Sequence, residues 1–369
     1  MVVGGGTPDT NNHKYWNGDI QWFTPSEIGR DKYVTNSLRT ISEEGLNKSS
    51  AKLLPIGTIL LSSRATVGEC SINKVECTTN QGFQSLIPKE NFSKEFVFYL
   101  MQTKRKELIR KSCGSTFLEI SANEVRKIKI AVPTSKEQEK ISKLLALLDE
   151  RISTQNKIIN KLQSLIKGIM IELQKQGQNK GNWRNVLLSK VLTERDERNT
   201  NLYQVFSVSV SRGVINQVDY LGRSFAARDT SKYNVVHYGD LVYTKSPTGA
   251  YPYGIVKQNL NQENVAVSPL YGVYIPNSLS VGTYLHEYFR SEINTHNYLH
   301  PLIQKGAKNT INITNQRFLE NSVPMPVCAN ELLLISKLLI SFNDKIKYQQ
   351  SILQQYQKQK QYLLRQMFI

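Results

Sequence analysis

Two long stretches of the chain place apolar residues alternately three and four positions apart, which is the spacing of a coiled-coil seam. The first seam comprises Leu145, Leu148, Ile152, Gln155, Ile159, Leu162, Ile166 and Ile169. The second comprises Leu339, Phe342, Ile346, Gln349, Leu353, Tyr356, Lys360 and Leu363. Gln155 and Gln349 hold equivalent positions, and a single polar residue in an apolar seam can fix helix register. Each helix could instead cover its own domain, but two matched seams in one chain favour pairing with each other.

The two seams belong to a tandem repeat. The segment Ile141–Leu145 recurs as Ile335–Leu339, 194 positions later. Further upstream, Pro55–Leu60 resembles His237–Val242 at a smaller offset of 182. An offset that changes in steps is expected when loops differ in length on a common scaffold. Each repeat unit is therefore one mixed domain followed by one long helix.

Turn and capping residues divide the chain into four segments. Thr134 and Ser135 before Glu137 and Gln138 predict a capping box at the start of the first helix, and Gly177–Asn182 is expected to end that helix. Pro324 and Pro326 end the second domain before the second helix. The predicted segments are a domain over 1–133, a helix over 134–181, a domain over 182–326 and a helix over 327–369. At ~1.5 Å per residue, a helix of roughly 40 residues would span about 60 Å.

Both domains are expected to mix helices and strands, which makes the fold α+β. Apolar runs that leave a turn predict strands at Gly57–Ser62 and Gly239–Tyr243. Denser apolar runs predict the starts of packed helices at Phe96–Met101 and Tyr284–Phe289.

The charge of the chain points to a polyanionic partner. Lys and Arg number 47 against 30 Asp and Glu, which gives a net charge of +17. Nucleic acid is the commonest partner of such a protein, and acidic proteins or membrane surfaces are the alternative. No apolar run approaches the ~20 residues that span a bilayer, and the first residues carry no secretion signal. The four cysteines lack Cys-x-x-Cys spacing, so we expect reduced thiols and a cytoplasmic protein: Cys70, Cys77, Cys113 and Cys328.

The sequence offers almost nothing that could catalyse a reaction. No Asp or Glu has a Lys two positions later, and there is no phosphate-binding loop of the Walker type. The Asn-Pro-Pro and Asp-Pro-Pro elements used by adenine methyltransferases are also absent. His296 and His300 have the spacing of a helical metal pair, but without a third ligand they are expected to have surface or packing roles. We therefore expect no catalytic residue, no metal site and no cofactor in this chain.

Loops rich in basic, hydroxyl and amide side chains remain as candidates for DNA contacts. Arg reads guanine edges, Asn and Gln read adenine, and Ser, Thr and Lys hold phosphates. In the first unit the candidates are Ser63, Arg64, Thr66, Asn80 and Gln81. In the second unit they are Lys245, Ser246, Thr248, Lys305, Lys308 and Asn309. Each loop alone could be ordinary solvated surface, but loops after equivalent strands of both repeats favour DNA reading.

Along nearly its whole length the chain resembles the specificity subunit of Type I restriction–modification systems. The motifs that carry the resemblance are, in order, Gly5–Pro8, Tyr15–Ile20 with Trp22, Gly57–Leu60, Arg64–Gly68, Thr79–Phe83, Leu118–Ile120, Ile130–Pro133 and Glu137–Ile141. The second unit keeps their order but few of the residues. It also opens with Trp183–Leu192, which has no counterpart in the first unit. A shortened N-terminus or a locus that exchanges such segments would explain that difference.

The resemblance implies two target-recognition domains, each reading one half of a split, asymmetric DNA target. The two helices would pair antiparallel and set the gap between the halves. Two adenine methyltransferase subunits would dock on the chain, followed by motor–nuclease subunits, and those partners would use S-adenosylmethionine, ATP and magnesium. The alternative from another class is a stand-alone DNA-binding regulator or architectural protein with the same two-domain clamp.

Overall fold

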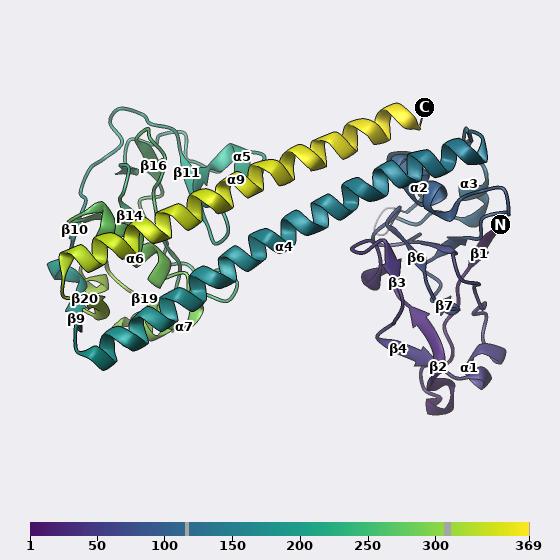
Figure 1. The fold of residues 1–369 in the computed structure, drawn as a ribbon, viewed down its shortest axis with the longest axis horizontal. Coiled ribbons are helices and arrows are strands. Elements are labelled where there is room, and N and C mark those ends of the chain that lie inside the picture. Colours follow the sequence, from purple (N-terminus) through teal and green to yellow (C-terminus); the bar gives the residue numbers. More distant parts are fainter. Residues whose placement is uncertain (115–117, 306–310, 369) are drawn as a thin grey trace. The chain divides into compact units, whose positions relative to one another are not determined.

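A computed structural model describes residues 1–114, 118–305 and 311–368, without the side chains of residues 305, 311 and 312. The chain forms two compact units (Figure 1). Unit 1 consists of Met1–Asn156 with Ile352–Ile369, and unit 2 consists of Lys157–Ser351. Each unit therefore contains one mixed domain and a segment of each long helix.

Unit 1 is built on a sheet with the strand order β1-β8-β5-β6-β3. Its strands are β1 (Val2–Gly4), β8 (Gln84–Leu86), β5 (Ile59–Leu61), β6 (Cys70–Asn73) and β3 (Tyr33–Val34). A second sheet has the order β4-β2-β7, with β4 (Arg39–Ile41), β2 (Trp16–Phe23) and β7 (Cys77–Thr79). Every residue of β5 is buried, so the predicted strand at Gly57–Ser62 is confirmed as a central strand.

The helices of unit 1 lie against both of its sheets. They are η1 (His13–Tyr15), η2 (Pro25–Glu27), α1 (Glu43–Asn47), α2 (Lys94–Arg110) and α3 (Ala122–Arg126). Helix α2 begins where the Ser93 hydroxyl accepts a hydrogen bond from the Phe96 amide. The buried run from Phe96 to Met101 packs against the strands, and Val97, Phe98 and Tyr99 share one core with Ile59 and Ile72.

Unit 2 repeats this plan with a sheet in the order β10-β17-β14-β15. Its strands are β10 (Leu192–Glu194), β17 (Gly272–Pro276), β14 (Leu241–Tyr243) and β15 (Val256–Gln258). Four smaller pairings complete the domain: β9 (Trp183–Leu187) with β20 (Ser322–Pro326), β11 (Phe206–Ser209) with β12 (Gly213–Asn216), β13 (Asn234–Val236) with β16 (Val265–Val267), and β18 (Gln304–Lys305) with β19 (Ile311–Asn312).

The helices of unit 2 are η3 (Leu188–Lys190), α5 (Gln217–Leu221), α6 (Leu279–Tyr288), α7 (Glu292–Leu299), η4 (His300–Leu302) and α8 (Asn315–Phe318). Helix α6 follows β17 as α2 follows β8, and both contain a run of consecutive buried residues. The strand pairings also correspond, because β14 pairs with β15 and β17 just as β5 pairs with β6 and β8. The repeat predicted from the sequence is therefore a repeat of strand order.

The extra opening of the second unit is structured. Trp183–Leu187 pairs antiparallel with Ser322–Pro326 as β9 and β20, and Leu192–Glu194 forms the edge strand β10. Strand β1 takes the corresponding edge position in unit 1, where it pairs with β8. Only the β9 and η3 part of the opening therefore lacks a counterpart among the described residues of unit 1.

Two long helices, α4 (Ser135–Lys180) and α9 (Ala329–Met367), follow the two domains. The capping box is confirmed, since the Thr134 amide and hydroxyl donate to the Glu137 carboxylate at 3.2 and 2.9 Å. The C-terminal end differs in detail from the prediction. Gly177 lies inside the helix, and it is Gly181, with a left-handed φ of 70°, that follows the last helical residue.

The helices run antiparallel within each unit. In unit 1, Leu145 shares a core with Leu363 and Leu364, and Asp149 pairs with Lys360. A later residue of α4 therefore contacts an earlier residue of α9, which means that the two helices run in opposite directions. In unit 2, the Trp183 indole just after α4 donates to Glu331 at the start of α9 at 2.8 Å. Buried seam residues line both segments: Leu145, Leu148, Gln155, Ile159, Ile166, Leu339 and Ile346. The fold is thus the predicted one, with two mixed domains and an antiparallel coiled coil.

Candidate DNA interface

The loop after β5 in unit 1 is a tight turn held by its own main chain. The Ser62 amide donates to the Glu69 carbonyl at 2.8 Å, and the Gly68 amide donates to the Ser62 carbonyl at 3.0 Å. Ala65 has a φ of 56°, which turns the chain sharply between Arg64 and Thr66. Arg64 and Thr66 are exposed at this turn, whereas Ser63 is fully buried. Arg64 and Thr66 are therefore available to a ligand as the loop stands, and Ser63 would first have to become exposed.

Arg64 forms an ion pair with Glu119 at 2.7 Å. Both side chains remain nearly half exposed, and an exposed pair of this kind contributes at most about 1 kcal/mol. A phosphate or a guanine edge could therefore replace Glu119 at little cost.

A backbone hydrogen bond connects the two candidate loops of unit 1. The Ser63 amide donates to the Gly82 carbonyl at 2.8 Å, which joins the Arg64 turn to the Asn80–Gln81 turn. Asn80 is engaged within its own turn, because its side-chain oxygen accepts from the Gly82 amide at 2.9 Å. Gln81 is exposed and accepts a hydrogen bond from the Thr7 hydroxyl. The structure thus brings the candidates of unit 1 together.

The N-terminal turn packs directly on the Asn80–Gln81 turn. A Cβ atom on Gly5 would lie 2.0 Å from the Asn80 carbonyl oxygen, so no larger residue fits there. The Gly6 amide donates to the Thr79 carbonyl at 2.8 Å, and the Trp22 indole donates to the Gly6 carbonyl at 2.9 Å. The glycine pair noted in the sequence therefore allows the N-terminal turn to approach closely and support the candidate loop.

In unit 2, the corresponding loop is a hairpin between β14 and β15. Thr248 and Tyr251 exchange two backbone hydrogen bonds of 3.0 Å across a turn at Gly249, whose φ is 55°. The buried Tyr251 hydroxyl donates to the Arg290 carbonyl at 2.7 Å and anchors the hairpin to the end of α6. Ser246 is exposed at this hairpin and Thr248 is partly exposed.

Lys245 has an unusual environment at the base of this hairpin. Its backbone is left-handed, with a φ of 61°, and burial lowers the pKa of its amino group while nearby Glu194 raises it. It forms no ion pair with any described residue. A half-buried cation without a carboxylate partner is suited to receive an anionic group.

Three further candidates of unit 2 lie at or beyond the end of the described range 118–305. Lys305 ends strand β18. Lys308 and Asn309 lie outside the described residues. Their assignment to DNA contact stays a prediction, as does that of the other candidate loop residues.

Sequence reasoning missed the polar contacts between distant parts of unit 2. Arg195 forms a bidentate ion pair with Asp240, with hydrogen bonds of 2.6 and 3.1 Å, and the Asp240 side chain is almost completely buried. This pair supports the turn from which β14 begins, because Asp240 also accepts from the His237 amide at 2.8 Å. Charged residues 45 positions apart give no periodic signal that could have revealed the pair.

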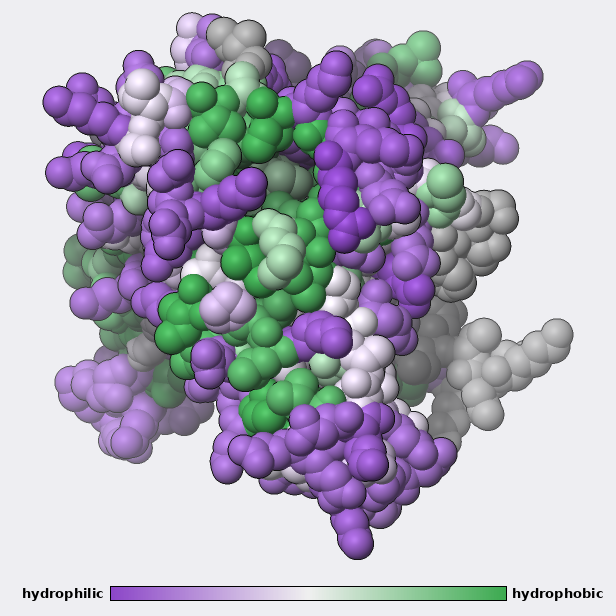
Figure 2. Space-filling model, turned by 90° about the vertical axis from the view of Figure 1, so that its right-hand side faces the viewer, coloured by the Kyte–Doolittle hydropathy of each residue, from purple (hydrophilic) through white to green (hydrophobic). Residues whose placement is uncertain are grey.

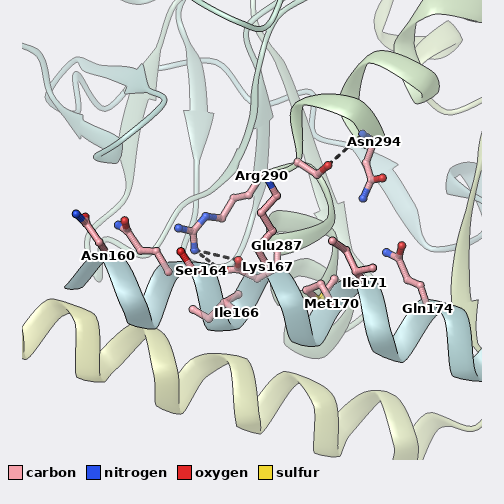
Figure 3. Close-up of a pocket in the computed structure, with 12 residues that line it drawn as sticks. Asn160, Ser164, Ile166, Lys167, Met170, Ile171, Gln174, Glu287, Arg290 and Asn294 are labelled. Atoms are coloured by element: carbon pink, nitrogen blue, oxygen red, sulfur yellow. Dashed lines mark hydrogen bonds and ion pairs between the residues drawn. The ribbon is translucent and has the colours of Figure 1, made fainter. Parts of the chain in front are cut away.

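A cavity of about 340 Å³ lies between α4 and α6–α7 within unit 2 (Figure 3). Ile166, Met170 and Ile171 of α4 supply apolar side chains. On the opposite wall, the buried Glu287 accepts from Arg290 at 3.0 Å and from Asn343 of α9 at 2.8 Å. The Glu287 carboxylate thus has a cationic partner in Arg290, and its hydrogen bond with Asn343 ties α6 to α9.

Within the described residues, no group of three or more His, Cys, Asp or Glu side chains could hold a metal ion. His296 and His300 stack with ring centroids 5.3 Å apart, and both rings also contact Tyr253. They pack as an aromatic cluster, which agrees with the predicted packing role. No helix in the described part of the chain is long and apolar enough to cross a membrane.

Comparison with known proteins identifies the first domain. Residues 2–164 match the family model of the Type I restriction modification DNA specificity domain. The MjaIX specificity subunit of Methanocaldococcus jannaschii is 38% identical over 181 residues, which cover 47% of this chain and 42% of that protein. The EcoR124I/EcoR124II specificity subunit of Escherichia coli is 31% identical over 153 residues, which cover 40% of this chain and 38% of that protein. The chain therefore spans less than half the length of these curated relatives.

Solved structures match the chain over its full length. The S subunit of a Type I system from M. genitalium aligns with a TM-score of 0.57 at 12% identity, over 98% of this chain and 99% of that one. A structure concerned with complex assembly of the Type I system aligns with a TM-score of 0.54 at 15% identity, over 99% and 94%. At such identities the likeness shows the fold alone. Residues 2–164 thus match the Type I restriction modification DNA specificity domain, and the chain that carries them has the fold of the Type I S subunit from M. genitalium.

Proposed function

We propose that this chain is the sequence-specific DNA-recognition subunit of a Type I restriction–modification complex. The observation that carries the proposal is the pairing of a specificity-family domain with a second domain that has the same strand order. Two DNA-reading domains on one chain fit a target made of two separate halves. The net charge of +17 supplies the general attraction to phosphates that such binding needs.

Each domain would read one half-site through the loop that follows its central strand. In unit 1 this loop presents Arg64 and Thr66, and in unit 2 it presents Lys245 and Ser246. The antiparallel helices would set the gap between the two halves. Because the half-site loops have different side chains, the target would be asymmetric.

The outer faces of the long helices support docking of further subunits. Exposed apolar side chains on these helices include Leu144, Leu147, Ile158, Leu165, Leu334, Tyr348 and Tyr362. Leu334, Tyr348 and Tyr362 are spaced 14 residues apart, which keeps them near one helix face away from the seam. Large apolar groups at that spacing suit helices of a partner protein. Two methyltransferase subunits would bind there, followed by motor–nuclease subunits.

Chemistry would then belong to those partners. S-adenosylmethionine would be held by the methyltransferases, and ATP and magnesium by the motor subunits. This chain would supply DNA recognition without catalysis, in the cytoplasm where bacterial DNA lies.

The decisive experiment maps methylated adenines in the host genome with and without the gene. Loss of one bipartite methylated sequence on deletion, restored by the gene, is the expected result. An unchanged methylation map would contradict the proposal. Co-purification separates the subunit from a regulator, since only the subunit should form a stable complex with a methyltransferase. Purified chain incubated with DNA, S-adenosylmethionine, ATP and magnesium should leave the DNA unmodified.

A further inference from the structure

One exposed segment of unit 2 combines arginines with unburied aromatic rings. It begins at Arg212, just before β12, and comprises β12, α5 and the residues up to Lys232. Phe225 is 57% exposed and Tyr220 is 40% exposed, although both are large apolar rings. Arg212, Arg223, Arg228 and Lys232 are exposed in the same stretch. We refer to Arg212–Lys232 as the aromatic–arginine segment.

The arginines lie over the aromatic rings. The Arg223 guanidinium is 4.5 Å from the centroid of the Phe225 ring, and that of Arg212 is 5.8 Å from the Tyr220 ring. None of the four cations forms an ion pair with a described carboxylate, in contrast to Arg195, Arg290 and Arg317 of the same unit. Their charges are therefore free to meet an anionic partner.

The backbone of the segment is fixed even though its side chains are exposed. The Phe225 amide donates to the Gln217 side-chain oxygen at 2.7 Å, and the Asn216 side chain caps α5 through the Val218 amide at 2.9 Å. The Ala227 amide donates to the Tyr233 hydroxyl at 3.1 Å. Phe225 is thus held outward by hydrogen bonds to its main chain.

An exposed aromatic ring flanked by free arginines matches the chemistry of duplex DNA. Apolar rings contact base surfaces or wedge into a base step, and arginines beside them hold the phosphates. A protein partner of neutral surface would leave these cations desolvated without a counter-charge. The charge of the segment therefore favours DNA over a protein.

We propose that the aromatic–arginine segment is a DNA-contacting element of the second domain, with Phe225 against the bases and Arg223 and Arg228 on the phosphates. The inference rests on the proposed function and adds to it a specificity-determining residue. Phe225 lies outside the hairpin that carries Lys245, so the second half-site would be read by two separate elements of one domain. The Phe225 ring would discriminate sequence, whereas the arginines would add affinity for any sequence.

The test uses the full chain and two readouts. A methylation map from a host carrying Phe225→Ala should show relaxed or altered bases in one half-site, with the other half-site unchanged. For the purified chain on a 40-bp duplex of fixed sequence, Arg223→Ala and Arg228→Ala should each reduce the slope of log affinity against log salt by about 1. On a duplex that carries the mapped target, Phe225→Ala should weaken binding about tenfold.

Two exposed residues outside the segment serve as matched controls. Tyr238→Ala removes a ring that is 45% exposed, and Lys347→Ala removes an exposed cation, and neither should alter DNA affinity or the salt slope. If Phe225→Ala leaves both half-sites unchanged while the chain still directs methylation, the inference fails and the proposed function stands. If Phe225→Ala abolishes co-purification with the methyltransferase but not DNA binding, the segment is a protein-docking surface and the inference is overturned.

Discussion

Asp149 of α4 and Lys360 of α9 form an ion pair of 2.6 Å within unit 1. The same carboxylate accepts a hydrogen bond from the Tyr99 hydroxyl of α2 at 2.6 Å, so domain and helices share one polar contact. Asn343 aligns with Asp149 in the sequence repeat, and it bonds to Glu287 of α6 in unit 2. Each domain is therefore tied to a helix through a polar side chain at the same repeat position.

Replacing Lys360 with Met should destabilise the chain by about 1–2 kcal/mol, because the partly buried Asp149 loses its cation. Chemical denaturation of the full chain measures the change in the free energy of unfolding. Lys358→Met, on an exposed position of the same helix, should change it by less than about 0.5 kcal/mol. The double variant with Asp149→Asn should be less destabilised than the sum of the single variants, and strict additivity would argue against the pair.

Gly177 and Gly168 offer a matched comparison within α4. A Cβ atom on Gly177 would lie 2.1 Å from the Trp183 ring, whereas one on Gly168 would meet nothing within 4 Å. Gly168→Ala should therefore stabilise the chain by about 0.5–1 kcal/mol through helix propensity. Gly177→Ala should destabilise it, because Trp183 must leave its site beside Glu331. Thermal unfolding of both variants checks whether the melting temperature rises for one and falls for the other. Shifts in the same direction would contradict the close approach of Gly177 to the Trp183 ring.

Lys257 on β15 predicts a dependence of stability on pH. Burial lowers its pKa to about 8, with Arg290 lowering it further and Glu287 opposing the shift. Between pH 8 and about 10.5 the unfolded chain holds the proton that the folded chain releases, so this group makes the free energy of unfolding rise with pH. Below pH 8 both states are protonated and the full cost of burial is present.

Lys257→Met should therefore stabilise the chain by about 2–3 kcal/mol at pH 7, with a gain that vanishes towards pH 10.5. Denaturation curves at several pH values measure this. The exposed Lys347→Met should show no such trend. A gain for Lys257→Met that is the same at every pH would rule out the lowered pKa as its cause.

Arg64 and Lys245 should act on different half-sites. If Arg64 reads a guanine, Arg64→Ala should weaken recognition of one half-site by about 1–3 kcal/mol, and Lys245→Ala should affect only the other. Binding to duplexes with one half-site altered at a time separates the two effects. A uniform loss across unrelated sequences would instead identify the residue as a phosphate contact.

Lengthening both helices should lengthen the gap in the target. Seven residues inserted after Ile152 and seven after Ile346 keep both seams in phase and add about 10.5 Å, or about three base pairs. A methylation map should show both half-sites unchanged and a longer gap, although three base pairs also rotate the second half-site by about a third of a turn. Insertion of three residues in each helix is the control. It takes the seam out of phase and should therefore abolish methylation of the target sequence. Changed half-sites at an unchanged gap would refute the idea that the helices set the spacing.

The sequence predicted the elements whose signal is periodic or local. The coiled-coil seam, the capping box at Thr134 and the strands before both candidate loops are each encoded within a few neighbouring residues. Contacts between residues that are far apart in the sequence could not be predicted in this way. Lys360 was placed in the seam by its spacing, but nothing nearby in the chain indicates that Asp149 and Tyr99 would lie beside it. The aromatic–arginine segment also escaped, because short irregular stretches lack a period and only the fold shows that Phe225 stays exposed.

The Arg64 turn keeps its shape through main-chain hydrogen bonds between Ser62, Gly68 and Glu69. The Thr66 hydroxyl adds a hydrogen bond of 3.1 Å to the Ser62 hydroxyl, whereas the Arg64 side chain points outward into an exposed ion pair with Glu119. Replacing Arg64 should therefore change the side chain that the turn presents to a ligand without unfolding the domain. The hydrogen bonds that shape this turn and the side chain exposed on it are separate parts of the loop.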